Sequence, residues 1–316
     1  MRALLHIALL AFASVVSAQP YPARPIHLVV AFPPGGPVDI VVRLITPPMA
    51  ETLGQPLVVE NRAGAGGNLP TSQVAKAASD GYTLLAHSAS YAINPSLWPD
   101  PGYDPRKDFA PVAVVALQPN VIVVQEAFPA RTLAELVQMA RTQQLAYASP
   151  SSGTTAHLTA ENLFRLRAKV DITHVPFKGA GPAVAAVLGG QPPIASLGVS
   201  GPIAQIKAGK LRALAVSSRE RLAALPDVPT LGELGYAGME DYVWIGLFAP
   251  AGTPLAVLEK LNQAARKAVQ MPAIRERLVA LGFDPGGEAL PETARFVSDE
   301  IAKWSRVVRE TGAKAE

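Results

Sequence analysis

Short apolar runs alternate with amphipathic segments along most of the chain. Residues 26–32 are apolar apart from His27, and similar runs follow at residues 57–60, 82–86 and 145–148. Continuous apolar runs are typical of strands that are buried on both faces of a parallel sheet. Because segments with helical spacing lie between these runs, the pattern predicts βαβ units and an α/β fold.

The same alternation continues to the end of the chain without a low-complexity linker. Further strands are predicted at residues 112–116, 121–125, 172–175, 211–216 and 243–249, and further helices at 69–78, 133–142, from Thr154 onward, 182–188, 254–269 and 294–308. Direct crossovers near 121–125 and 243–249 then divide the chain into two lobes. Residues 19–122 and 245–316 form the first lobe, and residues 123–244 form the second. Two short crossovers make a hinge, and hinged lobes close around a ligand.

The first 18 residues have a different character from the rest. Arg2 precedes an apolar stretch at residues 4–16, and the small residues Ser17 and Ala18 follow it. This order is typical of a secretory signal peptide cleaved near Ala18. A membrane anchor is the alternative, but the stretch is short for a hydrocarbon layer of roughly 30 Å. We therefore expect an exported, soluble protein.

Composition excludes several classes of protein. The chain has 316 residues, 28 Lys+Arg against 25 Asp+Glu, 17% charged residues and no cysteine. No basic cluster indicates nucleic-acid binding, and the absence of cysteine excludes thiolate metal sites, a cysteine nucleophile and an acylated-cysteine anchor. The chain contains neither an H-E-x-x-H motif nor a P-loop. We therefore predict no metal and no cofactor.

The loop at residues 32–39 is the first candidate binding element. Gly36 and Pro37 are well suited to the start of a helix, whose free N–H groups favour a carboxylate. A turn without a ligand is the other interpretation. Asp39 lies in the first helical turn, where it either stabilises the helix dipole or meets a ligand group.

A similar loop occurs in the second half of the chain. Phe177 precedes Gly179 and Ala180, and the pair Gly181-Pro182 is predicted to open a helix. Two facing helix N-termini would hold the two ends of a dianion. A third loop, residues 149–155, carries five hydroxyls around Gly153, and Thr154 is a good N-cap. His157 is expected to be a structural hydrogen-bonding residue, and Trp244 and Trp304 are expected to pack in the core or hinge.

A series of motifs in this order resembles one known family, the substrate-binding proteins of tripartite tricarboxylate transporters, or Bug receptors. The motifs are YPARPI at 21–26, FPPGG at 32–36 with Asp39, LGQP at 53–56, ENRAGAGG at 60–67, DGYTLL at 80–85, YDP at 103–105 with DF at 108–109, YAS at 147–149, HVPFKG at 174–179, PDVPT at 226–230 and APAGTP at 249–254. The resemblance covers nearly all of the chain after residue 18.

This resemblance implies a two-lobe periplasmic binding protein of the Venus-flytrap, type II-like class, with a mostly parallel sheet flanked by helices in each lobe. It implies a ligand that is a di- or tricarboxylate, an amino acid or an aromatic acid. It also implies transfer of this ligand to a membrane permease by a monomeric protein that is not an enzyme. The predicted ligand-binding residues are Phe32, Pro33, Gly35, Gly36, Asp39, Ser88, Ser149, Ser152, Gly153, Thr154, Thr155, Phe177, Gly179 and Ala180.

Some residues depart from the family pattern. Pro37 and Val38 replace small residues, and Phe177 replaces a more usual tyrosine. Pro47 and Pro48 lie inside the first predicted helix, which we expect to kink or stop near Thr46. Two alternative functions remain: a secreted hydrolase that uses Ser149 or Ser151 with His157, and a ligand sensor for a membrane signalling partner.

Overall fold

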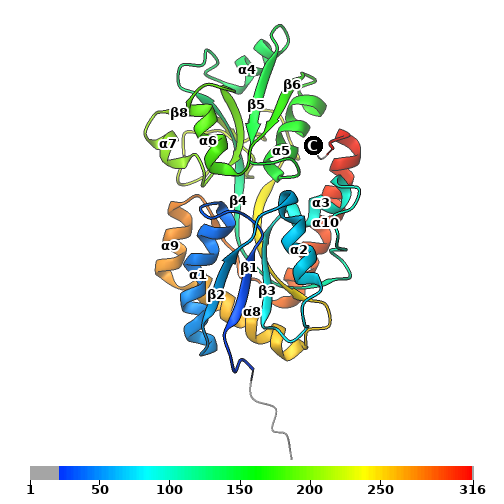
Figure 1. Cartoon of the computed structure of the whole chain (residues 1–316). Coiled ribbons are helices and arrows are strands. Elements are labelled where there is room, and N and C mark those ends of the chain that lie inside the picture. The colour runs from blue at the N-terminus through cyan, green and yellow to red at the C-terminus, as the bar shows by residue number, and fades with distance from the viewer. Residues whose placement is uncertain (1–20, 315–316) are drawn as a thin grey trace, which may run out of the picture.

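The computed structural model describes residues 21–314, and the predicted signal peptide lies outside them. Two groups of strands, each flanked by helices, are stacked end to end (Figure 1). The long strand β4 (Phe109–Gln125) and the strand β9 (Tyr242–Pro250) run side by side where the two groups meet (Figure 1). We call the group that contains β1 lobe 1 and the group that contains β5 lobe 2. Within residues 21–314, no helix is long and apolar enough to span a membrane.

Lobe 1 contains three parallel strands, β2 (Leu57–Asn61), β1 (Ile26–Val30) and β3 (Thr83–Ser88), in that spatial order. Strand β9 is antiparallel to β3, and β4 and the short β10 (Asp284–Pro285) complete the sheet. One core holds α1 (Pro37–Leu53), α8 (Leu255–Gln270) and α9 (Pro272–Ala280). A second core holds α2 (Asn68–Ala75), α3 (Ser90–Leu97) and α10 (Leu290–Thr311), and the short η1 (Ala65–Gly67) precedes α2.

Lobe 2 repeats this plan with β6 (Ile172–Pro176), β5 (Leu145–Ser149) and β7 (Ile194–Gly198) in parallel. The end of β4 and β8 (Leu211–Val216) add antiparallel strands. The helices α4 (Leu133–Ala140), α5 (Thr155–Glu161) and η2 (Asn162–Arg167) belong to one core, and α6 (Ala180–Leu188) and α7 (Ile203–Lys207) belong to the other. The predicted α/β class is thus confirmed, with mixed sheets in which three strands are parallel.

Strand β4 corrects one expectation. The two strands predicted at residues 112–116 and 121–125 form one strand of 17 residues. Its partners change in the middle: Pro119 pairs with Tyr242 of β9, whereas Asn120 pairs with Gly198 of β7. Proline lacks the N–H that a ladder needs, and here it lies where the chain exchanges one partner for another. The lobe boundaries at 122/123 and 244/245 remain a proposal, within a few residues of this change.

We expected the first helix to kink or stop near Thr46, and the stop is wrong, because α1 continues through Pro47 and Pro48 to Leu53. The face of α1 that is turned away from the exposed Pro47 explains why the helix continues. Ile45 and Met49 are fully buried in the core of lobe 1, and burial of such side chains contributes roughly 1.5–3 kcal/mol each. Packing therefore outweighs the hydrogen bonds that the prolines remove.

Candidate functional site

The candidate site lies where the carboxyl ends of the parallel strands of the two lobes face each other. In Figure 1, β1 rises from the free end of lobe 1 toward lobe 2. The loop after β5 reaches lobe 1, because a Cβ atom on Gly153 would lie 2.7 Å from Asn94 Oδ1 and 2.7 Å from Leu97 Cδ2. This loop and the loop after β1 contain most of the predicted site residues.

The loop between β1 and α1 is held by the side chain of Asp39, which is buried. Its Oδ2 atom accepts a hydrogen bond from the Gly35 N–H at 2.9 Å. Its Oδ1 atom accepts from Arg43 Nε and from Asn61 Nδ2, both at 2.9 Å. The same amide of Asn61 donates to the carbonyl of Phe32 at 3.2 Å. Asp39 and Asn61 therefore hold the backbone of this loop at Gly35 and at Phe32.

These contacts also determine the charge of Asp39. Burial alone would raise the pKa of its carboxyl, but the hydrogen bonds from Gly35, Arg43 and Asn61 and the charge of Arg43 lower it. Asp39 is therefore ionised, and both of its oxygens have protein donors. Neither the dipole interpretation nor the ligand interpretation predicted this clamp.

The predicted helix start at this loop is present. Gly36 is the N-cap of α1 in an extended conformation, and Pro37 is the first helical residue. The next N–H groups, of Val38 and Asp39, have no partner inside the helix because of their position. Pro33 and Gly35 are exposed, and Phe32 is partly buried. Phe32 packs edge-on against His87, with ring centroids 5.0 Å apart.

The hydroxyl loop after β5 is folded onto its own backbone. The hydroxyls of Ser149 and Thr154 donate to the carbonyl of Ser151, at 3.1 and 2.9 Å. Thr154 is the N-cap of α5, as predicted, and accepts from the His157 N–H at 3.3 Å. The hydroxyl of Ser152 is buried and has no partner within residues 21–314. Among the predicted hydroxyls in the described residues, that of Ser152 is the one without a hydrogen-bond partner.

The hydroxyls of two predicted residues, Thr155 and Ser88, contact groups outside the three loops. Thr155 Oγ1 contacts Asn120 Oδ1 at 3.4 Å, in the region where β4 and β9 pass between the lobes, which we call the hinge. Ser88, at the end of β3, is buried, and its hydroxyl accepts from the Ser90 N–H at 3.3 Å.

The third loop is joined to the second. The Phe177 N–H donates to the Ser149 carbonyl at 2.9 Å, and the Gly179 N–H donates to the Pro150 carbonyl at 2.8 Å. Gly179 has φ = 114°, in the region that favours glycine, and is the N-cap of α6. The helix therefore begins at Ala180, earlier than the predicted pair Gly181-Pro182.

Two histidines lie behind the hydroxyl loop. His174 Nε2 is 2.7 Å from Ser149 Oγ, and His157 Nδ1 accepts from the Gly153 N–H at 3.3 Å. Burial, followed by the charges of His174 and Arg165, lowers the pKa of His157 to about 3. Burial lowers the pKa of His174 to about 4. Both rings are therefore neutral near pH 7.

The described residues do not form the serine–histidine pair that the hydrolase alternative predicted. Ser149 contacts His174 rather than His157. A catalytic triad also needs a carboxylate that orients the histidine. Within residues 21–314, neither His157 nor His174 forms a hydrogen bond or ion pair with a carboxylate.

Sequence reasoning missed the polar residues where the hydroxyl loop meets lobe 1. Asn94 Nδ2 donates to the Gly66 carbonyl at 3.0 Å and to Asn68 Oδ1 at 2.7 Å. Asn94 Oδ1, Asn68 Nδ2 and Trp98 Nε1 are buried without a partner in the described part of the chain. No motif marks these residues, although Asn68 directly follows the glycine motif at 60–67.

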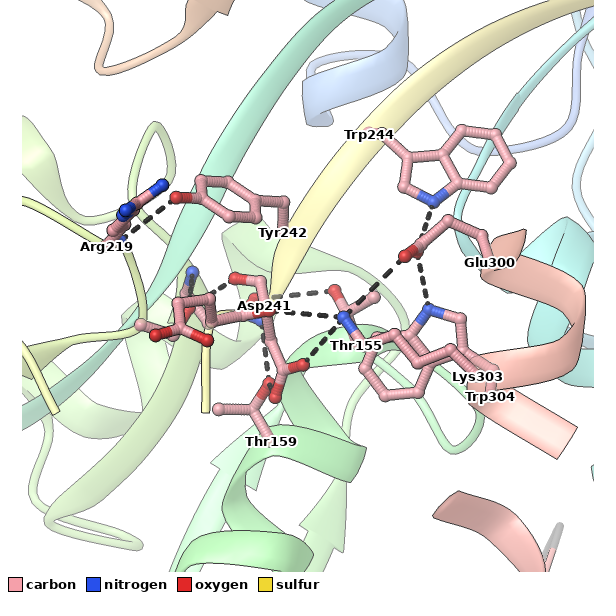
Figure 2. A network of polar contacts seen from close by, with 12 residues as sticks. Thr155, Thr159, Arg219, Asp241, Tyr242, Trp244, Glu300, Lys303 and Trp304 are labelled. Atoms are coloured by element: carbon pink, nitrogen blue, oxygen red, sulfur yellow. Dashed lines mark hydrogen bonds and ion pairs between the residues drawn. The ribbon is translucent and has the colours of Figure 1, made fainter. Parts of the chain in front are cut away.

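The hinge carries a second polar network, shown in Figure 2. Lys303 on α10 lies 3.1 Å from Asp241 Oδ1 and 3.6 Å from Glu300 Oε1. The indole N–H groups of Trp244 and Trp304 both donate to Glu300 Oε2 at 2.8 Å. The expected packing role of the two tryptophans is thus accompanied by a polar one.

This network connects the two lobes. Thr159 on α5 donates to Asp241 Oδ2 at 3.1 Å and accepts from Asn120 Nδ2 at 3.0 Å. Ser217 donates to the Asp241 carbonyl and accepts from the Asn120 N–H. The two crossovers, α5 and α10 are therefore joined through one connected set of buried and partly buried side chains.

An open pocket of about 350 Å³ lies beside the hinge and apart from the predicted site. Ser218, Arg219, Tyr242 and Asp284 are among the residues that line it. None of the predicted ligand-binding residues lines this pocket, and its basic and acidic groups do not select one charge of ligand.

Comparisons with known proteins find one family and several solved structures to which this chain is similar. The model of the family described as tripartite tricarboxylate transporter family receptor matches residues 41–313. BugT of Bordetella pertussis is 41% identical over 314 residues, which cover 98% of this chain and 96% of BugT. Among solved structures, Rpa4515 of R. palustris with adipate has a TM-score of 0.88 and 34% identity, and the match covers 94% of this chain and 100% of that one. MatC from Rhodopseudomonas palustris with bound malate has a TM-score of 0.84 and 37% identity, with coverages of 91% and 100%.

Proposed function

Because the chain belongs to the tripartite tricarboxylate transporter receptor family, we propose that it captures a small organic carboxylate between its two lobes and delivers it to a membrane permease. The family is periplasmic and consists of solute-binding receptors rather than enzymes. The predicted signal peptide agrees with export to the periplasm.

The observation that carries this proposal is the position of three helix starts. Helices α1, α5 and α6 begin directly after β1, β5 and β6, at the edges where the lobes face each other. Each start has N–H groups without intrahelical partners and a partial positive charge, so it favours a carboxylate. A ligand that touches both lobes stabilises their closed arrangement.

We propose the predicted residues of the three loops as the ligand site, with different roles. The backbone at Gly36 and at the starts of α5 and α6, together with the Ser152 hydroxyl, would face the ligand. Asp39 and the two histidines would shape the loops. Helix ends supply the positive potential locally, so the formal net charge of only +3 is sufficient.

The ligand class is proposed from relatives. One similar solved structure is described as Rpa4515 with adipate, and another as MatC with bound malate. Both molecules carry a carboxylate at each end. Two carboxylates match a site with helix starts on both lobes. We therefore expect a dicarboxylate to bind this chain.

Titration calorimetry with adipate, malate and a wider panel of carboxylates tests the proposal. We expect a dissociation constant in the micromolar range and a melting temperature that rises with ligand, since a hundredfold excess over Kd stabilises the fold by about 2.7 kcal/mol. Matched methyl esters, which lack the negative charge, serve as controls and should not bind. A folded protein that binds no member of the panel would contradict the proposal.

Delivery to a permease needs a separate measurement. Cells that lack this chain should lose uptake of the radiolabelled ligand, and the wild-type gene should restore it. Unchanged uptake, with the binding intact, would favour a sensor role instead.

A further inference from the structure

The two histidines behind the hydroxyl loop form a stacked pair. Their ring centroids are 4.0 Å apart and their planes are inclined by 15°. His157 comes from α5 and His174 from β6. One ring contacts the Gly153 N–H and the other contacts the Ser149 hydroxyl, at opposite ends of the loop.

These contacts define the protonation of both rings. A ring nitrogen accepts a hydrogen bond only when it carries no proton, so His157 has its proton on Nε2. Ser149 has one hydroxyl hydrogen, which is directed to the Ser151 carbonyl. The assignment that satisfies both contacts of Ser149 therefore has His174 donating from Nε2 to Ser149 Oγ.

The surroundings oppose a positive charge on either ring. Glu161 accepts from the Tyr147 hydroxyl at 2.8 Å and lies 3.4 Å from Arg165. Arg165 itself lowers the pKa of His157. Asp241, which faces α5 from the hinge, is paired with Lys303. The nearby carboxylates thus have other partners, and two stacked cations would repel each other.

We propose that His157 and His174 are positioning residues that hold residues 149–153 in their ligand-binding shape only while both rings are neutral, so that acid releases the ligand. This inference rests on the proposed function, because it assigns the loop to the ligand. Protonation of His157 at Nδ1 would place a second donor against the Gly153 N–H and break the contact. A protonated His174 would keep its Nε2 donor, but its charge would be buried 4.0 Å from the His157 ring.

The direction of the pH dependence follows from the lowered pKa values. When the loop opens, the rings meet water and their pKa returns toward the ordinary value of about 6.5. The opened loop then binds more protons than the closed one below that pH. Each histidine favours opening by up to about tenfold for each unit of falling pH. Affinity is therefore constant above about pH 6.5, and it falls only below the pH at which the opened, protonated loop becomes populated in the ligand-free protein.

The test compares neutral substitutes with the wild type. In the double variant His157→Asn and His174→Gln, amide groups stand near the positions of Nδ1 and Nε2 and carry no charge at any pH. The Kd of each protein for adipate or malate at pH 7 is the reference for its own value at pH 4.5. At pH 4.5, the wild type should have weakened at least tenfold more than the double variant. The probe itself also titrates, but it does so equally in both experiments.

His27→Gln is the control, since His27 lies on β1 and pairs with Glu60 away from the loop. This variant should follow the wild type at every pH. A double variant that weakens as steeply as the wild type between pH 7 and pH 4.5 would overturn the proposal.

A readout without ligand separates this inference from the proposed function. Side-chain ¹⁵N chemical shifts of the wild type should show a proton-free Nδ1 on His157 and no titration of either ring above pH 5. A midpoint near pH 6.5 for either ring would overturn the proposed role of the two histidines. If neither probe binds the wild type at pH 7, the proposed function fails for these ligands. The chemical shifts then still test whether the two histidines hold the loop as neutral rings.

Discussion

At the residue scale, the site depends on backbone groups whose neighbours leave them available. Gly36 has φ = −81° and ψ = 170°, which any residue can adopt. A Cβ atom there would have only the Pro33 carbonyl within 4 Å, at 3.7 Å. A side chain at this position is therefore accommodated, and it would lie at the N-terminus of α1. This permits a test in which only charge changes.

We expect Gly36→Asp to abolish carboxylate binding and Gly36→Asn to retain more of it. Both side chains are good N-caps and should leave the unfolding free energy within about 1 kcal/mol of the wild type. Only the aspartate adds a negative charge where the ligand carboxylate is proposed to bind. Calorimetry with malate should show at least a tenfold difference in Kd between the two variants. Equal affinities would show that the ligand does not use this helix start.

At the scale of single elements, α1 shows tertiary packing that overrides local preference. Pro47 is exposed, and Pro48 is partly buried, within a helix that continues to Leu53. Each proline removes a backbone hydrogen bond and costs about 3 kcal/mol in a helix interior. The helix persists because residues such as Ile45 and Met49 are fully buried on its other face.

We therefore expect Pro47→Ala to stabilise the protein. The alanine N–H can donate to the Arg43 carbonyl, and the gain is reduced by the extra freedom of the unfolded chain, about 0.4–1 kcal/mol. The net rise in unfolding free energy should be about 1–2 kcal/mol in a denaturant titration. Pro37→Ala is the control, because an N–H at the first helical position gains no partner. If Pro47→Ala lowers stability, the helix depends on the proline in a way that packing does not explain.

At the scale of the whole molecule, α10 connects the lobes. It packs in the second core of lobe 1 and also contacts α5 and η2 of lobe 2. Lys303 carries the polar part of this connection (Figure 2). Burial would lower the pKa of Lys303, but the charges of Asp241 and Glu300 raise it, so it stays protonated. Removing it leaves two carboxylates facing each other at the hinge.

We expect Lys303→Met to lower the unfolding free energy by about 2–3 kcal/mol, between the usual effects for a surface pair and for a buried pair, because Lys303 is partly exposed and Asp241 is buried. Lys107→Met is a matched control, because Lys107 pairs with Asp104 on the surface and is 82% exposed. Its effect should be below about 1 kcal/mol. Adding Asp241→Asn to Lys303→Met should recover part of the loss in a double-mutant cycle. Equal losses for the two lysine variants would contradict a role for the hinge pair.

The amino-acid sequence by itself determined the features that depend on near neighbours. Apolar runs predicted strands such as β1 and β9, Thr154 predicted a helix cap, and the order of motifs predicted the family. The tertiary structure alone decided which groups meet. Ser149 contacts His174, 25 residues away, and Asp39 contacts Asn61, 22 residues away. Only the fold positions such partners, because hydrogen bonds depend on distance in space, whereas periodicity and caps act within a few residues. For the same reason, packing against the sheet carried α1 through its prolines, and the exchange of partners made β4 one strand.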